Sequence, residues 1–288
     1  WDERNFNIEN NSIIIDAKLD ENDINFDSFL EKVSLSAVLG KPLVVSEWNM
    51  PFPNKYEYEA MPIITAYALL QDWDALFLFD YTNNLSKLPV QNGIEDFFDT
   101  MNNSVKMSQS PLCSMMFLRG DLKRANRKIT FNLPKTDIIN EYKYTGESRK
   151  IKVEGGYIPS SVIYTNRINL SNDESLRRTL MTDVFTPNQL LKLQTETVHI
   201  SDTNEIKWDL GTNNKEHLWI NSNSTQGAVG FLKDQTIQTN NLTLNIVTNS
   251  SCFLTSLDGN PITTSQKMLL SLAAGQRNTN QEDTETTT

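Results

Sequence analysis

The sequence predicts an α/β region followed by an all-β region, and three observations support this fold class. Two segments, residues 41–51 and 73–81, each contain a continuous apolar run, and they flank a segment whose apolar residues recur with the period of a helix. Continuous Val/Leu/Phe runs are typical of strands buried on both faces of a parallel sheet. Beyond residue 127 the pattern changes to short alternating strands separated by turn residues.

The first apolar run is the most informative segment, because it ends in Glu47, with Trp48 and Asn49 directly after it. The end of a buried strand is where α/β barrels display catalytic groups. Glu47 equally suits a structural role, capping the next helix or pairing with a lysine. Trp48 and Asn49 suit either a sugar site, as an aromatic platform and a hydrogen-bonding amide, or packing and a turn.

Residues 56–71 then predict a crossover helix. Because proline is tolerated only in the first turn, the helix begins close to Glu59 or is kinked at Pro62. The second apolar run follows at once, so the unit is strand, helix, strand, and its two strands are expected to be parallel.

Asp80 and Tyr81 close the second run. In a parallel pair they lie at the same end of the sheet as Glu47. Two roles fit Asp80 and Tyr81, contact with a substrate and a structural role. Trp73 precedes the strand and is expected to be a core residue.

These segments resemble a known enzyme family. The run from Pro42 to Asn49, the helix, and the run from Leu70 to Tyr81 are similar to strands seven and eight of a retaining, two-glutamate (β/α)8 glycoside hydrolase. Segments 201–208 and 256–261 resemble the β-rich domains of bacterial cellulase-like and β-galactosidase-like proteins. The resemblance implies the C-terminal portion of a TIM (β/α)8 barrel followed by a β-sandwich. It also implies that Glu47 is the nucleophile and that Trp1 is a candidate sugar contact.

Retaining hydrolysis needs a second carboxyl group about 5 to 5.5 Å from the nucleophile. A full barrel needs about 250 residues, and only about forty precede the first predicted strand, so the acid/base glutamate and the rest of the barrel are expected in missing N-terminal sequence. Glu57, Glu59 or Asp80 would need an unusual geometry to replace it. The alternative function is a non-catalytic carbohydrate-binding or structural β-module attached to a degenerate barrel.

The predicted domains are residues 1–127 for the barrel part, 128–275 for a sandwich-like β region, and 276–288 for a disordered tail. Trp208 and Trp219 lie on strands of the β region, as core residues or as a sugar-stacking pair. Further predicted elements are short helices at 93–99, 108–118 and 173–178, and strands at 128–133, 149–153, 161–164, 167–170, 197–200, 205–208, 217–220, 227–231, 242–247, 252–255 and 267–272.

The composition narrows the classes of partner that this chain is expected to bind. The 288-residue chain is 38% hydrophobic and 22% charged, as a globular protein is, and its formal charge of -10 argues against nucleic acid or an anionic membrane. No apolar run approaches the roughly 20 residues of a membrane span. The two histidines are too few for a convincing zinc site, and no cofactor is expected. Cys113 and Cys252 are predicted to be buried free thiols. A polysaccharide-degrading enzyme implies an extracellular or periplasmic location.

Overall fold

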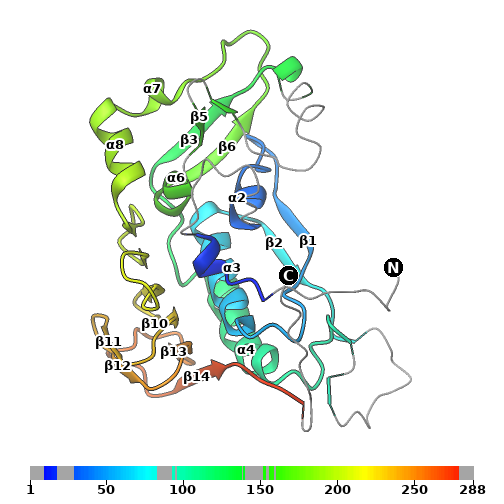
Figure 1. The fold of residues 1–288 in the computed structure, drawn as a ribbon, viewed down its shortest axis with the longest axis vertical. Coiled ribbons are helices and arrows are strands. Elements are labelled where there is room, and N and C mark those ends of the chain that lie inside the picture. The colour runs from blue at the N-terminus through cyan, green and yellow to red at the C-terminus, as the bar shows by residue number, and fades with distance from the viewer. Residues whose placement is uncertain are drawn as a thin grey trace.

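The computed structural model describes residues 10–17, 29–82, 93–94, 96–137, 139, 152–153, 156–158 and 160–278. Helix α3 (Ala60–Gln71) lies at its centre (Figure 1). Pro62 is the third residue of α3, and a short 3-10 turn, η2 (Glu57–Glu59), precedes it. The predicted helix start close to Glu59 is confirmed, because proline in the first turn gives up no intrahelical hydrogen bond.

The predicted strand–helix–strand unit is confirmed. Strand β1 (Val44–Trp48) precedes α3, β2 (Ala75–Leu78) follows it, and the two strands pair in parallel. Trp73, just before β2, is buried in the core as predicted. This unit, with helix α4 (Ser104–Arg119) packed against α3, positions the candidate site.

Helix α4 begins and ends on residues suited to those positions. The side chain of Asn103 accepts a hydrogen bond from the backbone of Lys106, and Gly120 closes the helix in the left-handed region at φ 66°. The helix predicted at 93–99 is wrong, since the described residues of that segment form bends.

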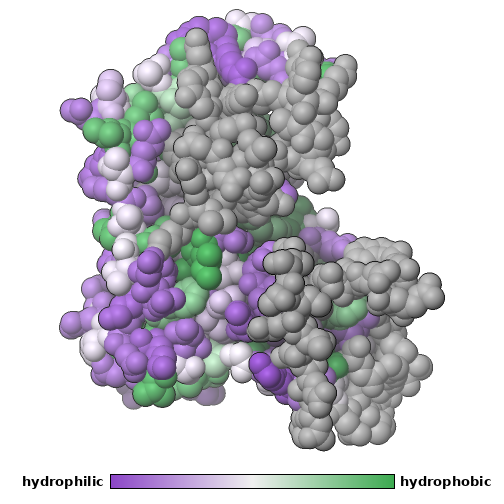
Figure 2. Space-filling model, in the orientation of Figure 1, coloured by the Kyte–Doolittle hydropathy of each residue, from purple (hydrophilic) through white to green (hydrophobic). Residues whose placement is uncertain are grey.

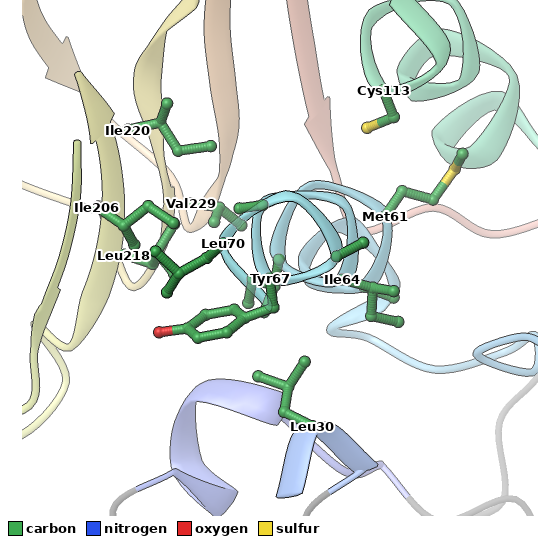
Figure 3. Close-up of a cluster of buried hydrophobic side chains, with 14 of the residues drawn as sticks. Leu30, Met61, Ile64, Tyr67, Leu70, Cys113, Ile206, Leu218, Ile220 and Val229 are labelled. Carbon is green, nitrogen blue, oxygen red and sulfur yellow. The ribbon is translucent and has the colours of Figure 1, made fainter. Parts of the chain in front are cut away.

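A six-stranded antiparallel sheet packs against α3, in the order β14-β13-β10-β9-β8-β7. Ile206, Leu218, Ile220 and Val229 point from this sheet toward α3, while Leu30 of α2 (Phe29–Ser34) lies on the opposite side of the helix (Figure 3). The strands are β7 (Val198–Ile200), β8 (Ile206–Asp209), β9 (His217–Asn221), β10 (Thr225–Gly230), β13 (Ser250–Ser256) and β14 (Met268–Ala274).

The middle of the outer face of this sheet is covered by a hairpin of β11 (Gln235–Gln238) and β12 (Thr243–Ile246). Ile237 and Leu244 of the hairpin pack with Ala228 and Cys252 of the sheet. Cys252 and Cys113, in different parts of the chain, are both buried free thiols, as predicted.

A second parallel pair is formed by β3 (Lys128–Asn132) and β6 (Arg167–Ser171). Helix α6 (Ser160–Thr165) occupies the segment where a strand was predicted at 161–164, because a short buried apolar run fits either structure. The helix predicted at 173–178 is wrong, and helices form further on. The others are α1 (Ile13–Asp16), β4 (Lys152–Val153), β5 (Gly156–Tyr157), α7 (Met181–Val184) and α8 (Pro187–Thr195).

The fold-class prediction of a TIM-barrel portion followed by a β-sandwich is wrong. In the described part of the chain, the strands form one six-stranded antiparallel sheet and four separate two-stranded sheets, with no closed parallel barrel. A single hydrophobic cluster joins residues on both sides of position 127, including Ile14, Tyr67, Trp208 and Phe253. The predicted division into domains stays a prediction.

Candidate functional site

The candidate site lies on β1 and β2, and an irregularity in their pairing shapes it. Val45 pairs with Leu76 and Trp48 pairs with Leu78. Two residues of β1, Ser46 and Glu47, therefore stand opposite one residue of β2. This is a β-bulge, a feature that redirects side chains and is frequent beside active sites.

The bulge determines which way Glu47 points. Val45 and Trp48 are both buried in the core that includes α3. Strict alternation would place Glu47 on the same face as Val45, but the extra residue places Glu47 opposite Trp48, on the face away from α3. Ser46 and Glu47 are both exposed, in agreement with this geometry. The glutamate singled out in the sequence is therefore displayed to solvent.

The face that carries Glu47 is open and aromatic. Phe77 is 58% exposed, Phe79 is 39% exposed and Tyr81 is 56% exposed, and Val44 beside them is 47% exposed. In Figure 2 the clearest hydrophobic surface near the middle of the molecule lies over α1 of Figure 1, and a smaller patch lies over β1. The sequence did not single out Phe77, although an aromatic residue between two partly buried strand residues is a visible sign of the second face of a strand.

The other predicted site residues have different surroundings. Trp48 is only 7% exposed and packs in the core, away from Glu47. The side chain of Asn49 donates hydrogen bonds to the carbonyl oxygens of Phe79 and Phe98, at 2.7 Å for the latter, and so ties the end of β1 to neighbouring backbone. Trp1 lies outside the described residues.

Asp80 is half-buried at the end of β2. Burial raises the pKa of its carboxyl group, and the charges of Asp99 and Asp96 raise it further. Oδ1 of Asp80 is buried and has no hydrogen-bond partner among the described residues. Asp80 is thus the strand-end carboxyl whose protonated form the surroundings favour.

A buried polar cluster, which the sequence did not reveal, lies near Asp80. Nζ of Lys106 is 3.2 Å from Oε1 of Glu57, and both side chains are almost completely buried. Asn103 donates to the same carboxylate at 2.7 Å and Gln276 donates to its second oxygen at 2.8 Å. Glu57 and Lys106 are far apart in sequence and share no motif, so no local pattern points to this arrangement.

Lys106 is electrostatically coupled to the candidate site. Burial lowers its pKa, while the charges of Glu57, Asp99 and Asp80 act in the opposite direction. The positive charge of Lys106 in turn lowers the pKa of Asp80, against the larger effect of burial. The cluster can therefore adjust the protonation of Asp80 without facing the open surface itself.

Glu59 forms a separate buried contact. Its carboxylate accepts hydrogen bonds from Oγ of Ser12 at 2.8 and 3.0 Å and from the backbone of Ile14 at 3.2 Å. Burial raises its pKa to about 8. Glu57 and Glu59, named from the sequence as local substitutes for an acid/base, are thus both enclosed and held by other groups.

The tryptophans of the β region do not form a pair. Trp208 is completely buried and stacks near Tyr67 and Tyr164, with ring centroids 6.0 and 5.1 Å away. Trp219 pairs with Lys207, the neighbour of Trp208, and so lies on the opposite face of the sheet. The core alternative is therefore confirmed for Trp208, and the sugar-stacking pair is excluded.

Two further properties bear on the kind of site. Among the described residues no group of three or more His, Cys, Asp or Glu side chains is placed to hold a metal ion. None of the helices in that same part of the chain has the length and apolar character to cross a bilayer. Comparisons with protein-family models, curated proteins and solved structures found no significant match to this chain.

Proposed function

We propose that the open face of β1 and β2 binds carbohydrate and that Glu47 acts there as the nucleophile of a retaining glycoside hydrolase. The observation that carries this proposal is the bulge at Ser46 and Glu47, because it presents the carboxylate on the same face as Phe77, and the exposed rings of Phe79 and Tyr81 follow directly after β2. Aromatic rings supply flat apolar surface for a sugar ring, and the neighbouring polar groups fix its orientation.

The proposed chemistry is a double displacement. The carboxylate of Glu47 attacks the anomeric carbon, the bond to the departing oxygen breaks, and a glycosyl ester forms on Glu47. A second carboxyl group protonates the departing oxygen and then takes a proton from the water that hydrolyses the ester. No cofactor takes part.

The second carboxyl group is proposed to come from outside this chain. Glu57 is held by Lys106, Asn103 and Gln276, and Glu59 is held by Ser12 and Ile14. Neither is free to reach a sugar on the open face. The carbohydrate substrate and an extracellular or periplasmic location belong to this same proposal.

An activated inhibitor tests Glu47 as the nucleophile without requiring a second carboxyl group to act as the acid. A 2,4-dinitrophenyl 2-deoxy-2-fluoro glycoside has a leaving group that needs no protonation, so the glycosyl ester can form and accumulate. The protein is treated with the gluco and the galacto form of this reagent and then digested. We expect mass spectrometry to find one sugar label, on the peptide that contains Glu47. Glu47→Gln should remove the label, and the matched surface variant Glu196→Gln should keep it.

A second candidate is non-catalytic carbohydrate binding. It is favoured by the row Phe77, Phe79 and Tyr81, which offers a stacking surface whether or not Glu47 reacts. Binding of oligosaccharide with no label on Glu47 would select this candidate over the hydrolase. Absence of both labelling and binding would reject the two together.

A further inference from the structure

A polar cleft lies at the opposite end of β1 from Glu47. It has a volume of about 360 Å³, within the range of ligand pockets. The loop that leads into β1 forms one wall, the turn after α3 forms the second, and β3 with β6 forms the third. Its charged lining residues are Lys41, Asp72, Asp74, Lys128 and Arg167.

The two carboxylates of this cleft already have partners. Asp72 forms ion pairs with Arg167 and, at 3.6 Å, with Arg124. Oδ2 of Asp74 accepts a hydrogen bond from the backbone of Leu43 at 2.8 Å. Arginine therefore offsets the charge of Asp72, whereas Asp74 keeps its negative charge and holds the backbone just before β1.

The two lysines are in a different position. Among the described residues, neither Lys41 nor Lys128 forms an ion pair or a side-chain hydrogen bond, and both are exposed. Lys128 also stands directly opposite Arg167 in the β3–β6 pairing. Asp72 offsets the charge of Arg167, so Lys128 carries the uncompensated positive charge at this position of the pair, and an anion would balance it.

We propose that this cleft binds a small organic anion through its carboxylate or phosphate group, with Lys41 and Lys128 as the main contacts. The lining holds three cationic side chains and two carboxylates, a formal balance of one positive charge in a chain of formal charge -10. A cleft concentrates such a field and attracts anions. Asn169, also in the lining, adds an amide that can donate a hydrogen bond. The site is separate from the open face that carries Glu47.

Calorimetric titrations at constant ionic strength test this proposal. The probes are inorganic phosphate, glucose 6-phosphate and glucuronate, with neutral glucose as the control ligand. We expect saturable binding of at least one anionic probe and none of glucose in this cleft. Binding of glucuronate alone would identify the carboxylate as the recognised group, and binding of the two phosphates alone would identify the phosphate.

Two variants locate the binding. Lys128→Gln should weaken the anion at least tenfold, because it removes one of the two unpaired charges. Lys192→Gln, on the exposed helix α8, is the matched control and should bind as the unchanged protein does. Equal affinity in the two variants, or no saturable binding of any anion, would overturn the proposal. Lys128→Gln should also keep the melting temperature of the unliganded protein or raise it, which separates lost binding from lost folding.

Discussion

The two sheets that contact α3 differ in what their second face does. The six-stranded sheet packs against α3 on its inner face, and the β11–β12 hairpin covers the middle of its outer face, leaving Leu270 and Leu272 of the edge strand β14 exposed. The β1–β2 pair is covered by α3 on one side only and exposes Phe77, Phe79 and Tyr81 on the other. Burial on two faces favours stability, whereas an exposed aromatic face is typical of a binding surface. The middle of the six-stranded sheet therefore contributes to the core through both of its faces, whereas the β1–β2 pair contributes through one.

The largest difference between the two sheets should appear on replacing an aromatic side chain. Trp208→Ala removes a completely buried indole next to Tyr67 and Tyr164, and we expect a loss of about 3 to 5 kcal/mol in the free energy of unfolding. Urea denaturation measures it. A loss below about 1 kcal/mol would show that the inner face of the six-stranded sheet does not hold the fold together.

Breaking the buried ion pair of Glu57 and Lys106, near Asp80, should lower the free energy of unfolding by nearly as much. Lys106→Met leaves the carboxylate of Glu57 buried without its charge partner, which costs about 3 kcal/mol in comparable cases. The double variant Lys106→Met, Glu57→Gln should recover more than half of the loss, because both charges are then gone. Additive losses in the double variant would contradict the coupling of the two groups.

Glu59 should make stability depend on pH. Its pKa is about 8 in the folded protein, above the value of 4.5 for an unperturbed glutamate, so the folded state binds the extra proton between these values. Its contribution to stability is complete below pH 4.5 and is lost as the pH rises through 8. The free energy of unfolding should fall by at most about 1.4 kcal/mol per pH unit in this window. Glu59→Gln should flatten the curve, and an unchanged pH profile in this variant would contradict the assignment.

The smallest effect on stability is expected on the open face. Phe77→Ser removes a ring that is 58% exposed, and we expect a change within about 0.5 kcal/mol. The same change should lower concentration-dependent association, since exposed apolar strands with open edges favour contact between molecules. Light scattering at increasing protein concentration measures this. Unchanged association, or a loss of stability like that of Trp208→Ala, would show that the face is covered in solution.

The local elements around the site could be predicted from sequence, and the architecture could not. Apolar periodicity located β1, α3, β2 and most strands beyond residue 196, because each of these patterns is local. The same patterns do not say how many strands share a sheet. The runs that suggested a barrel belong to a two-stranded sheet, and the alternating segments that suggested a sandwich mostly join one six-stranded sheet.

The site shows the same limit. Glu47 could be selected from its place at the end of an apolar run, but the bulge that turns it outward and buries Trp48 depends on pairing with β2. The contact between Glu57 and Lys106 joins residues 49 positions apart, which no local pattern encodes.

The most direct test of the central claim is a titration of the ¹⁵N-labelled protein with oligosaccharides, followed by two-dimensional NMR. We expect saturable chemical-shift changes confined to the amides of Ser46, Glu47 and residues 77–81. Shifts gathered instead on the six-stranded sheet around Trp219, or no shifts with any oligosaccharide, would contradict it.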